Sequence, residues 1–184
     1  MQSRRSLRGF PPVIDADVRI LILGSFPSER SLARRQYYGH PQNQFWRLVG
    51  QVIEEPLHEM QYPAKLRALR RHRIGLWDVL ESCRRGGSLD SEIRDATHNR
   101  FERVTNVTKR LRRVCFNGKT AGRLGPYFAE QGYETFVMPS SSPANTVPFG
   151  IKLRTWRRAL SVSTLSVGKP AGHRPPLTGH PFQC

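Results

Sequence analysis

The residues of this sequence that could do chemistry gather in short segments, most of which directly follow an apolar run. The segments are GSFPS at 24–28, YYGHPQNQFW at 37–46, WD at 77–78, FNG at 116–118 and PSSSPAN at 139–145. All of them are polar or contain glycine, so they supply amide, hydroxyl and carboxyl groups beside aromatic rings. This mixture suits the binding of a flat, polar ligand.

A nucleobase extruded from a duplex is one such ligand. It needs an aromatic plane for stacking, polar groups that read its edge, and donors for the flanking phosphates. Candidate planes and edge readers are Tyr37, Tyr38, Phe45, Trp46, Asn43, Asp78 and Asn117, and candidate phosphate donors are Ser140, Ser141 and Ser142. The helical spacing of Phe45 and Trp46 favours core packing for those two. His40, ahead of a proline, is open to two roles: contact with the base, or bracing of the loop.

The elements that must position these segments follow from hydrophobic periodicity. Apolar runs predict strands over 18–23, 74–80, 113–116 and 133–138. Helical patterns cover 43–53, 64–73, 98–110, 118–129 and 151–160, and the polar stretch 83–95 is predicted as a loop. This alternation predicts an α/β fold, a three-layer α/β/α sandwich with a central four-stranded, mostly parallel sheet. Parallel strands host sites at their carboxyl ends, so we expect the polar segments to form one pocket.

Length and composition indicate one domain. The chain has 184 residues, enough for a single core. We expect a catalytic domain over 1–160 and a disordered tail over 161–184, where Ser, Thr, Gly and Pro dominate.

The charge of the chain indicates a polyanionic partner. Thirty Lys and Arg oppose 14 Asp and Glu, giving a formal net charge of +16. Arginine dominates, and its planar guanidinium suits phosphate, which favours nucleic acid over an anionic membrane. No run approaches the ~20 apolar residues of a spanning helix, and the basic first ten residues lack a signal peptide's apolar run. We therefore expect a cytoplasmic protein.

The cysteines argue against a metal centre. Cys83, Cys115 and Cys184 are widely spaced, with no CxxC and no zinc-finger spacing. An iron–sulfur cluster usually needs four cysteines. We expect reduced structural thiols, no metal and no iron–sulfur cluster.

The motifs as a set resemble the uracil-DNA glycosylase superfamily. ILGSFPS, YYGHPQNQFW, GLWDVLESCRRGGSLDSEIRD, FNGKTA and MPSSSPAN occur in the family's order, over about residues 9–160. The nearest branch in this resemblance is that of the hypoxanthine-DNA (deoxyinosine) glycosylases. HPQNQFW is also similar to a segment of mismatch-specific uracil glycosylases, and MPSSS to a loop of thymine-DNA glycosylases.

The resemblance implies a monofunctional enzyme of base excision repair. It would flip a deaminated base, hypoxanthine or uracil, out of DNA and hydrolyse its N-glycosidic bond to leave an abasic site. The same resemblance implies no cofactor and a monomer.

The resemblance also implies roles for individual residues. Phe26 stands where relatives carry the Asp or Asn that positions the attacking water, and Asn43 takes over that catalytic role. Tyr38 would stack on the base. The implied base-binding residues are Gly24, Ser25, Phe26, Tyr38, His40, Asp78 and Asn117. The implied DNA-binding residues are Pro27, Ser28, Ser140, Ser141, Ser142 and Asn145, of which Asn145 would face the orphaned base.

Asp78 is the candidate reader of the base edge. As an acceptor it would bond the N1–H of hypoxanthine or the N3–H of uracil, whereas adenine has no proton at N1. An ionised carboxylate beside a departing anionic base opposes the reaction, so we expect a raised pKa for Asp78. The alternative is a structural Asp78 that caps the strand end or pairs with an arginine.

Two other functions remain open from the sequence. Loss of the water-positioning residue at Phe26 is compatible with a DNA-binding module of the same fold without catalysis. An unrelated α/β hydrolase could use Ser28, Ser140 or Ser141 as nucleophile, but the chain has no G-x-S-x-G elbow. The sequence also leaves the choice between hypoxanthine and uracil open.

Overall fold

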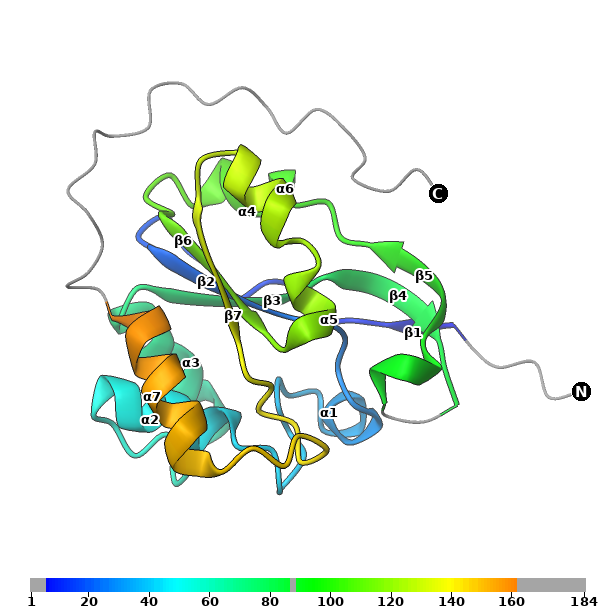
Figure 1. Cartoon of the computed structure of the whole chain (residues 1–184), viewed down its shortest axis with the longest axis horizontal. Coiled ribbons are helices and arrows are strands. Elements are labelled where there is room, and N and C mark those ends of the chain that lie inside the picture. The colour runs from blue at the N-terminus through cyan, green and yellow to red at the C-terminus, as the bar shows by residue number, and fades with distance from the viewer. Residues whose placement is uncertain (1–5, 87–88, 162–184) are drawn as a thin grey trace, which may run out of the picture.

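A parallel four-stranded sheet forms the centre of the molecule (Figure 1). The computed structural model describes residues 6–86 and 89–161. The sheet contains β2 (Ile20–Gly24), β3 (Ile74–Asp78), β6 (Arg113–Asn117) and β7 (Glu134–Met138), in the order β3-β2-β6-β7. All neighbours run parallel, which confirms the predicted fold class. The tail expected over 161–184 lies outside the described residues, apart from residue 161.

The central strand β2 is apolar throughout because both faces of the sheet are covered. In β2, Ile20 and Ile22 belong to one core cluster, whereas Leu21 and Leu23 belong to the other. Successive side chains of a strand point to opposite faces, so a strand between two helical layers must be apolar at every position. The near-continuous apolar runs in the sequence have this origin.

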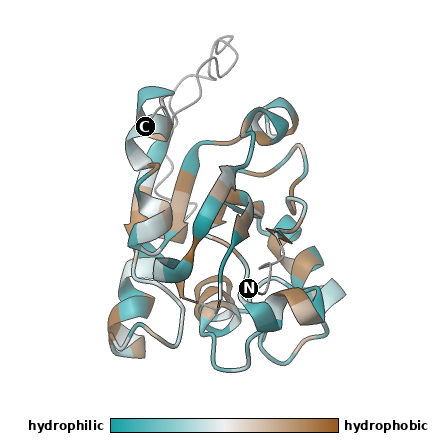
Figure 2. Cartoon of the chain, turned by 90° about the vertical axis from the view of Figure 1, so that its right-hand side faces the viewer, coloured by the Kyte–Doolittle hydropathy of each residue, from teal (hydrophilic) through white to brown (hydrophobic). Residues whose placement is uncertain are grey.

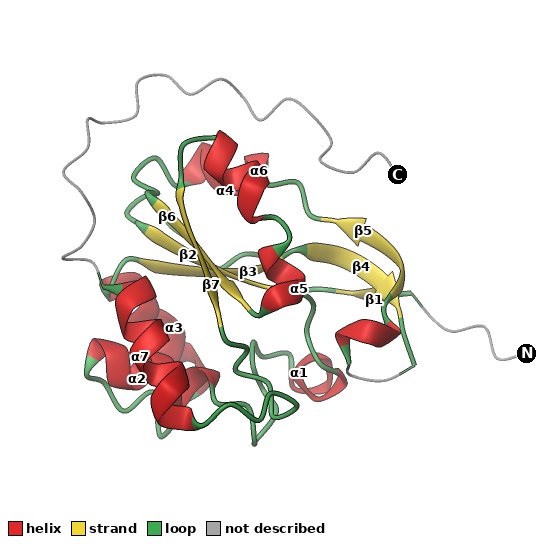
Figure 3. Cartoon of the chain, in the orientation of Figure 1, coloured by secondary structure: helices red, strands yellow, loops and turns green. Residues whose placement is uncertain are grey.

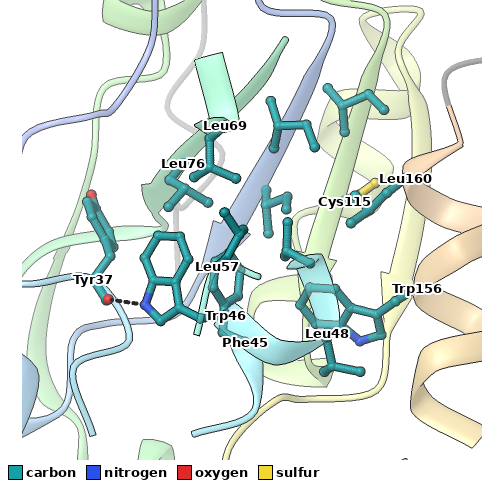
Figure 4. Close-up of a cluster of buried hydrophobic side chains, with 14 of the residues drawn as sticks. Tyr37, Phe45, Trp46, Leu48, Leu57, Leu69, Leu76, Cys115, Trp156 and Leu160 are labelled. Carbon is teal, nitrogen blue, oxygen red and sulfur yellow. Dashed lines mark hydrogen bonds between the residues drawn. The ribbon is translucent and has the colours of Figure 1, made fainter. Parts of the chain in front are cut away.

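Helices α2 (Phe45–Ile53), α3 (Tyr62–Arg71) and α7 (Phe149–Leu160) cover one face of the sheet. Phe45, Trp46 and Trp156 of α2 and α7 pack with leucines in the cluster drawn in Figure 4, where the Trp46 indole N–H donates to the Tyr37 carbonyl at 3.1 Å. Brown and teal segments alternate along the helical ribbons in Figure 2, as amphipathic helices require.

Helices α4 (Glu102–Val107), α5 (Lys119–Gly122) and α6 (Gly125–Glu130) lie on the opposite face (Figure 3). The helix predicted over 118–129 is therefore divided in two. In the part of the chain that the structure describes, none of the helices is long and apolar enough to cross a membrane.

A second sheet, antiparallel, is built from strands that flank the stretch predicted as a loop. It contains β1 (Leu7–Arg8), β4 (Leu80–Arg84) and β5 (Arg94–His98) in the order β1-β4-β5, and the short helix η1 (Asp90–Glu92) lies between β4 and β5. The loop predicted over 83–95 was wrong at its two ends, which belong to β4 and β5. The strand β5 was missed because it is largely exposed and polar, so it carries no hydrophobic signal. Pairing of β5 with β4 also shortens the predicted helix 98–110 at its start.

One further short helix, α1 (Glu29–Arg34), follows β2. Ser28 is its N-cap, with the Ser28 hydroxyl accepting from the Ser31 N–H at 3.2 Å. This helix fixes where the GSFPS segment leaves the sheet.

Candidate active site

The carboxyl ends of β2, β3 and β6 open on one cavity of about 300 Å³. The register of β2 and β3 places Gly24 beside Asp78, and Asn117 ends the strand on the other side of β2. Every base-binding, DNA-binding or catalytic residue that the resemblance implies, except His40, lines this cavity, whereas the candidate planes Phe45 and Trp46 do not. The polar segments, far apart in the sequence, therefore meet at one edge of the sheet.

Gly24 forms the floor of the cavity together with Asp78 and Tyr38. A Cβ atom at Gly24 would lie 2.6 Å from Asp78 Oδ1 and 3.0 Å from the Tyr38 hydroxyl. No side chain fits there without displacing both groups. The glycine thus allows a carboxyl and a phenol to approach the same point of the backbone.

The Asp78 carboxyl is buried, with 4% of the residue exposed. Its Oδ2 is enclosed without a hydrogen-bond partner, so Oδ1 is the oxygen that a ligand in the cavity can reach. The pKa of Asp78 is raised to about 7, first by burial and then by the charge of Asp90, while the positive charge of Arg85 lowers it. Near neutral pH the protonated and ionised forms of Asp78 therefore coexist.

Arg85, which the sequence did not single out, is a buried cation behind the cavity. Its guanidinium lies 5.1 Å from the centre of the Phe26 ring and donates to the Pro27 carbonyl, while Nε and Nη1 find no hydrogen-bond partner among the residues that the structure describes. It carries the positive charge that partly offsets Asp78. Arg85 follows β4, and its place became visible only once the second sheet was known.

Tyr38 lies flat against Phe45, with ring centroids 3.7 Å apart and planes at 8°. Phe45 is fully buried, as its spacing predicted, and it covers one face of Tyr38. A base can therefore stack only on the opposite face of the Tyr38 ring. Within residues 6–86 and 89–161 the enclosed Tyr38 hydroxyl makes no hydrogen bond, and burial raises its pKa well above the usual range.

Asn43 lies just before α2. Its Oδ1 accepts a hydrogen bond from the Phe45 N–H at 2.9 Å, which satisfies one of the free donors at the start of the helix. Its Nδ2 makes no hydrogen bond within the described residues. The amide thus has its oxygen fixed by the helix and its N–H groups available to the cavity.

Asn117 fixes the loop of residues 139–145, here called the serine loop, which follows β7. Its Nδ2 donates to the Ser141 hydroxyl and its Oδ1 accepts from the Ser141 N–H, both at 2.8 Å. Ser141 is fully buried, which turns its hydroxyl inward. The half-buried Ser140 and Ser142 remain the serines placed to meet a phosphate.

Lys152 of α7 holds the other end of the serine loop. Its fully buried side chain donates to the Asn145 carbonyl at 2.8 Å and to Gln44 Oε1 at 2.9 Å. The Asn145 side chain in turn donates to the Ser140 carbonyl at 3.1 Å. The loop is thus tied to both α2 and α7.

His40 lies outside the cavity that the other predicted residues share. Its Nδ1 accepts from the Gln42 N–H at 3.2 Å, which braces the loop. It lines a neighbouring hollow of about 480 Å³ with the basic side chains of Arg34, Arg47 and Lys65. Contact of His40 with the base stays a prediction.

The segment of Leu89 and the helix η1, here called the η1 segment, completes the rim of the cavity. Leu89 and Asp90 both line it, and the Ser25 hydroxyl donates to Asp90 Oδ1 at 2.6 Å. The sequence pattern around Leu89 and Asp90 gives no sign that they line the cavity, so they were not predicted as site residues. Among the described residues, 6–86 and 89–161, no group of three or more His, Cys, Asp or Glu side chains could hold a metal ion.

Comparison with known proteins identifies the family. The family model of the uracil DNA glycosylase superfamily matches residues 11–165. The chain belongs to this superfamily. The match spans every residue that lines the cavity.

Relatives within the superfamily cover most of the chain. A Methanosarcina acetivorans protein named hypoxanthine DNA glycosylase is 51% identical over 138 residues, 75% of this chain and 87% of its own length. A protein of the same name from Methanosarcina barkeri is 44% identical over 152 residues, covering 83% and 96%. The solution NMR structure of a uracil DNA glycosylase candidate from Methanosarcina acetivorans matches with a TM-score of 0.78 and 46% identity, over 85% of this chain and 97% of the other.

Proposed function

We propose that this superfamily member is a monofunctional DNA glycosylase that releases a deaminated base, hypoxanthine first and uracil second, and leaves an abasic site. The observation that carries the proposal is the acceptor Asp78 Oδ1 at the floor of a cavity lined by Tyr38, Asn43 and the serine loop. The names of the two Methanosarcina relatives support hypoxanthine as the preferred base. The same names disfavour a binding module without catalysis.

The base edge is read at the floor of the cavity. Hypoxanthine and uracil each carry an N–H next to a carbonyl, and Asp78 Oδ1 accepts that proton. Adenine offers a bare N1 at this position, which leaves the carboxyl without its bond. Sites built around a specific hydrogen bond reject a ligand that lacks it by a factor of about 10⁴ or more.

Bond cleavage places negative charge on the base and positive charge on the sugar. A pKa near 7 lets Asp78 carry a proton on the enclosed Oδ2 while Oδ1 still accepts from the base. No second anion then faces the departing one, and adenine still meets an acceptor oxygen at its bare N1. The N–H groups of Asn43 hold the water, since its oxygen is engaged by α2. The serine loop holds the flanking phosphates by hydroxyl and backbone donors.

The proposed function also includes how the enzyme meets DNA, its oligomeric state, its location and its need for a cofactor. Excess positive charge brings the DNA to the surface, and the chain acts as a monomer in the cytoplasm, within one catalytic domain. No cofactor is required, because water is the nucleophile and the base leaves with the electron pair of the broken bond.

The test is a panel of oligonucleotides, duplex and single-stranded, that carry one hypoxanthine, uracil, xanthine or mismatched thymine. Alkali converts each abasic site into a strand break. We expect breaks at hypoxanthine first and uracil second, and an Asn43→Ala variant slower by about 10²-fold or more. Absence of breaks with every base would refute the proposed function, and undiminished cleavage by Asn43→Ala would refute the role of Asn43.

A further inference from the structure

The η1 segment places an acidic side chain at the mouth of a cavity that is built to receive DNA. Asp90 is exposed, lines the cavity, and is fixed by the 2.6 Å hydrogen bond that Oδ1 accepts from Ser25. Ser25 belongs to the segment that follows β2, so the hairpin of β4 and β5 is bound to the central sheet at this point.

The other acidic side chains of this hairpin have local partners. Asp95 lies 3.7 Å from the Arg84 guanidinium, and Glu92 accepts from the Leu89 N–H at 3.2 Å. Asp90 forms no ion pair within the described residues; its carboxylate is held by a hydroxyl. Its second oxygen, Oδ2, is therefore available to the cavity.

A carboxylate at this place has a cost. It repels the phosphates that a chain of net charge +16 attracts, and its charge raises the pKa of Asp78. Such a charge is favourable only where positive charge develops. In hydrolysis of an N-glycosidic bond, that place is the sugar, which becomes an oxocarbenium-like cation in the transition state.

The depth of the two carboxyls agrees with this assignment. Asp78 is buried at the floor and Asp90 is exposed at the rim. This step rests on the proposed function: if the base edge meets Asp78, the sugar that carries the base lies nearer to the mouth of the cavity. Asp90, at the mouth of the cavity, then lies beside the sugar.

We propose that Asp90 is a second catalytic residue, which stabilises the sugar cation and accepts the proton of the attacking water. The bond between C1′ and the base nitrogen breaks, and its electron pair leaves with the base. The oxygen of water bonds to C1′, and the water proton passes to Asp90 Oδ2. The base anion takes up a proton from solvent.

Asp90 supplies what the neighbouring side chains lack. Asn43 can hold a water, but an amide takes up no proton at neutral pH, and its oxygen already accepts from the Phe45 N–H. Phe26 has no polar atom. Among these groups at the cavity, Asp90 combines exposure with a free carboxylate oxygen.

The experiment compares Asp90→Asn with Asp95→Asn on duplex DNA that contains one deoxyinosine. Asp95→Asn removes the same charge from the same hairpin but lies outside the cavity lining. Excision is measured in single turnovers with enzyme in excess, and DNA affinity by fluorescence anisotropy at fixed salt.

For Asp90→Asn we expect the excision rate to fall by about 10²-fold or more, with DNA affinity unchanged or tighter because a repulsive charge is gone. Asp95→Asn should keep the rate. If Asp90 had only a structural role, its substitution would lower DNA affinity together with the excision rate. Retention of the rate by Asp90→Asn would overturn the role of Asp90.

If Asp90→Asn loses affinity together with rate, Asp90→Ala with added formate decides. Formate can replace the missing carboxylate, so recovered excision supports the proposal, and no recovery overturns it. The wild-type chain in the same assay distinguishes failure of the proposed function from failure of the role of Asp90. Release of no base by the wild type would overturn the proposed function and this inference together, whereas equal rates in wild type and Asp90→Asn would overturn only this inference.

Discussion

The buried carboxyl of Asp78 is the residue on which the proposed recognition depends. It is almost fully enclosed, one of its oxygens has no partner, and an acid and an arginine act on it in opposite directions. Burial makes the ionised form unfavourable, so a carboxyl that would be charged in water is half protonated at about pH 7 here. That balance has consequences for activity and for stability.

The first consequence is a fall in excision rate as pH rises through about 7. Above the pKa of about 7, an ionised Asp78 faces the departing anionic base and opposes its release. Single-turnover rates on deoxyinosine DNA from about pH 5.5 to about pH 9 check this, with an Asp78→Asn variant as control. We expect the excision rate of the Asp78→Asn variant not to show this fall as pH rises through about 7. A wild-type rate that is level across pH 7 would contradict the assignment.

The second consequence concerns folding. The pKa of Asp78 is raised from 3.8 to about 7 on folding, so the folded state binds more protons between these values. The stability contributed by the protonated carboxyl is therefore lost as pH rises from about 4 through about 7. We expect Asp78→Asn to be more stable than wild type by roughly 2–4 kcal/mol at about pH 8.

Urea unfolding of wild type and Asp78→Asn at several pH values measures this difference. The difference should shrink as pH falls toward about 4, because both chains then carry a neutral group at this position. A constant difference across the range would show that the carboxyl does not titrate as described.

Among the elements, the strand ends and the serine loop act as one unit. Asn117 at the end of β6 bonds twice to Ser141, and Lys152 of α7 holds the loop at Asn145. The backbone of Gly118, with φ at 102°, lets the chain turn directly after Asn117. A loop fixed at both ends presents its hydroxyls in one arrangement, which limits the entropy lost on binding phosphate.

We expect Asn117→Ala to loosen this loop. The variant removes both hydrogen bonds to Ser141 and leaves buried polar groups unpaired, at a cost of about 2–4 kcal/mol in unfolding free energy. DNA affinity should fall as well, since the loop loses its fixed position. Urea unfolding and anisotropy measure the two effects, and Asn117→Asp, which keeps two acceptors for Ser141, is the matched control. Unchanged affinity in Asn117→Ala would contradict this role for the loop.

The contrast between the two sheets shows what could be predicted from sequence. The central strands were predictable because helices cover both faces of the sheet, which requires apolar runs such as that of β2. The strands β4 and β5 were not, because β5 is polar and exposed and its pairing depends on contacts across the chain. Arg85 and Asp90 belong to that hairpin region, so their places at the cavity could not be inferred from local pattern.

For the whole molecule, net charge governs the encounter with DNA. A formal charge of +16 predicts binding that releases counterions and therefore weakens with salt. We expect DNA affinity to fall by about 10- to 1,000-fold between roughly 50 and 200 mM salt. The single-turnover rate at saturating enzyme should change little, since the DNA is then fully bound at either salt concentration. Affinity independent of salt would contradict an electrostatic encounter.

The central claim is that one base leaves the duplex and enters the cavity at the ends of β2, β3 and β6. A crystal structure of the wild-type chain with duplex DNA that carries a 2′-fluoro deoxyinosine tests it most directly, because the fluorine opposes positive charge on the sugar and slows cleavage. The account predicts hypoxanthine in the cavity, with its N1–H within hydrogen-bond distance of Asp78 Oδ1. A hypoxanthine that stays stacked in the duplex, or that binds away from Asp78, would contradict it.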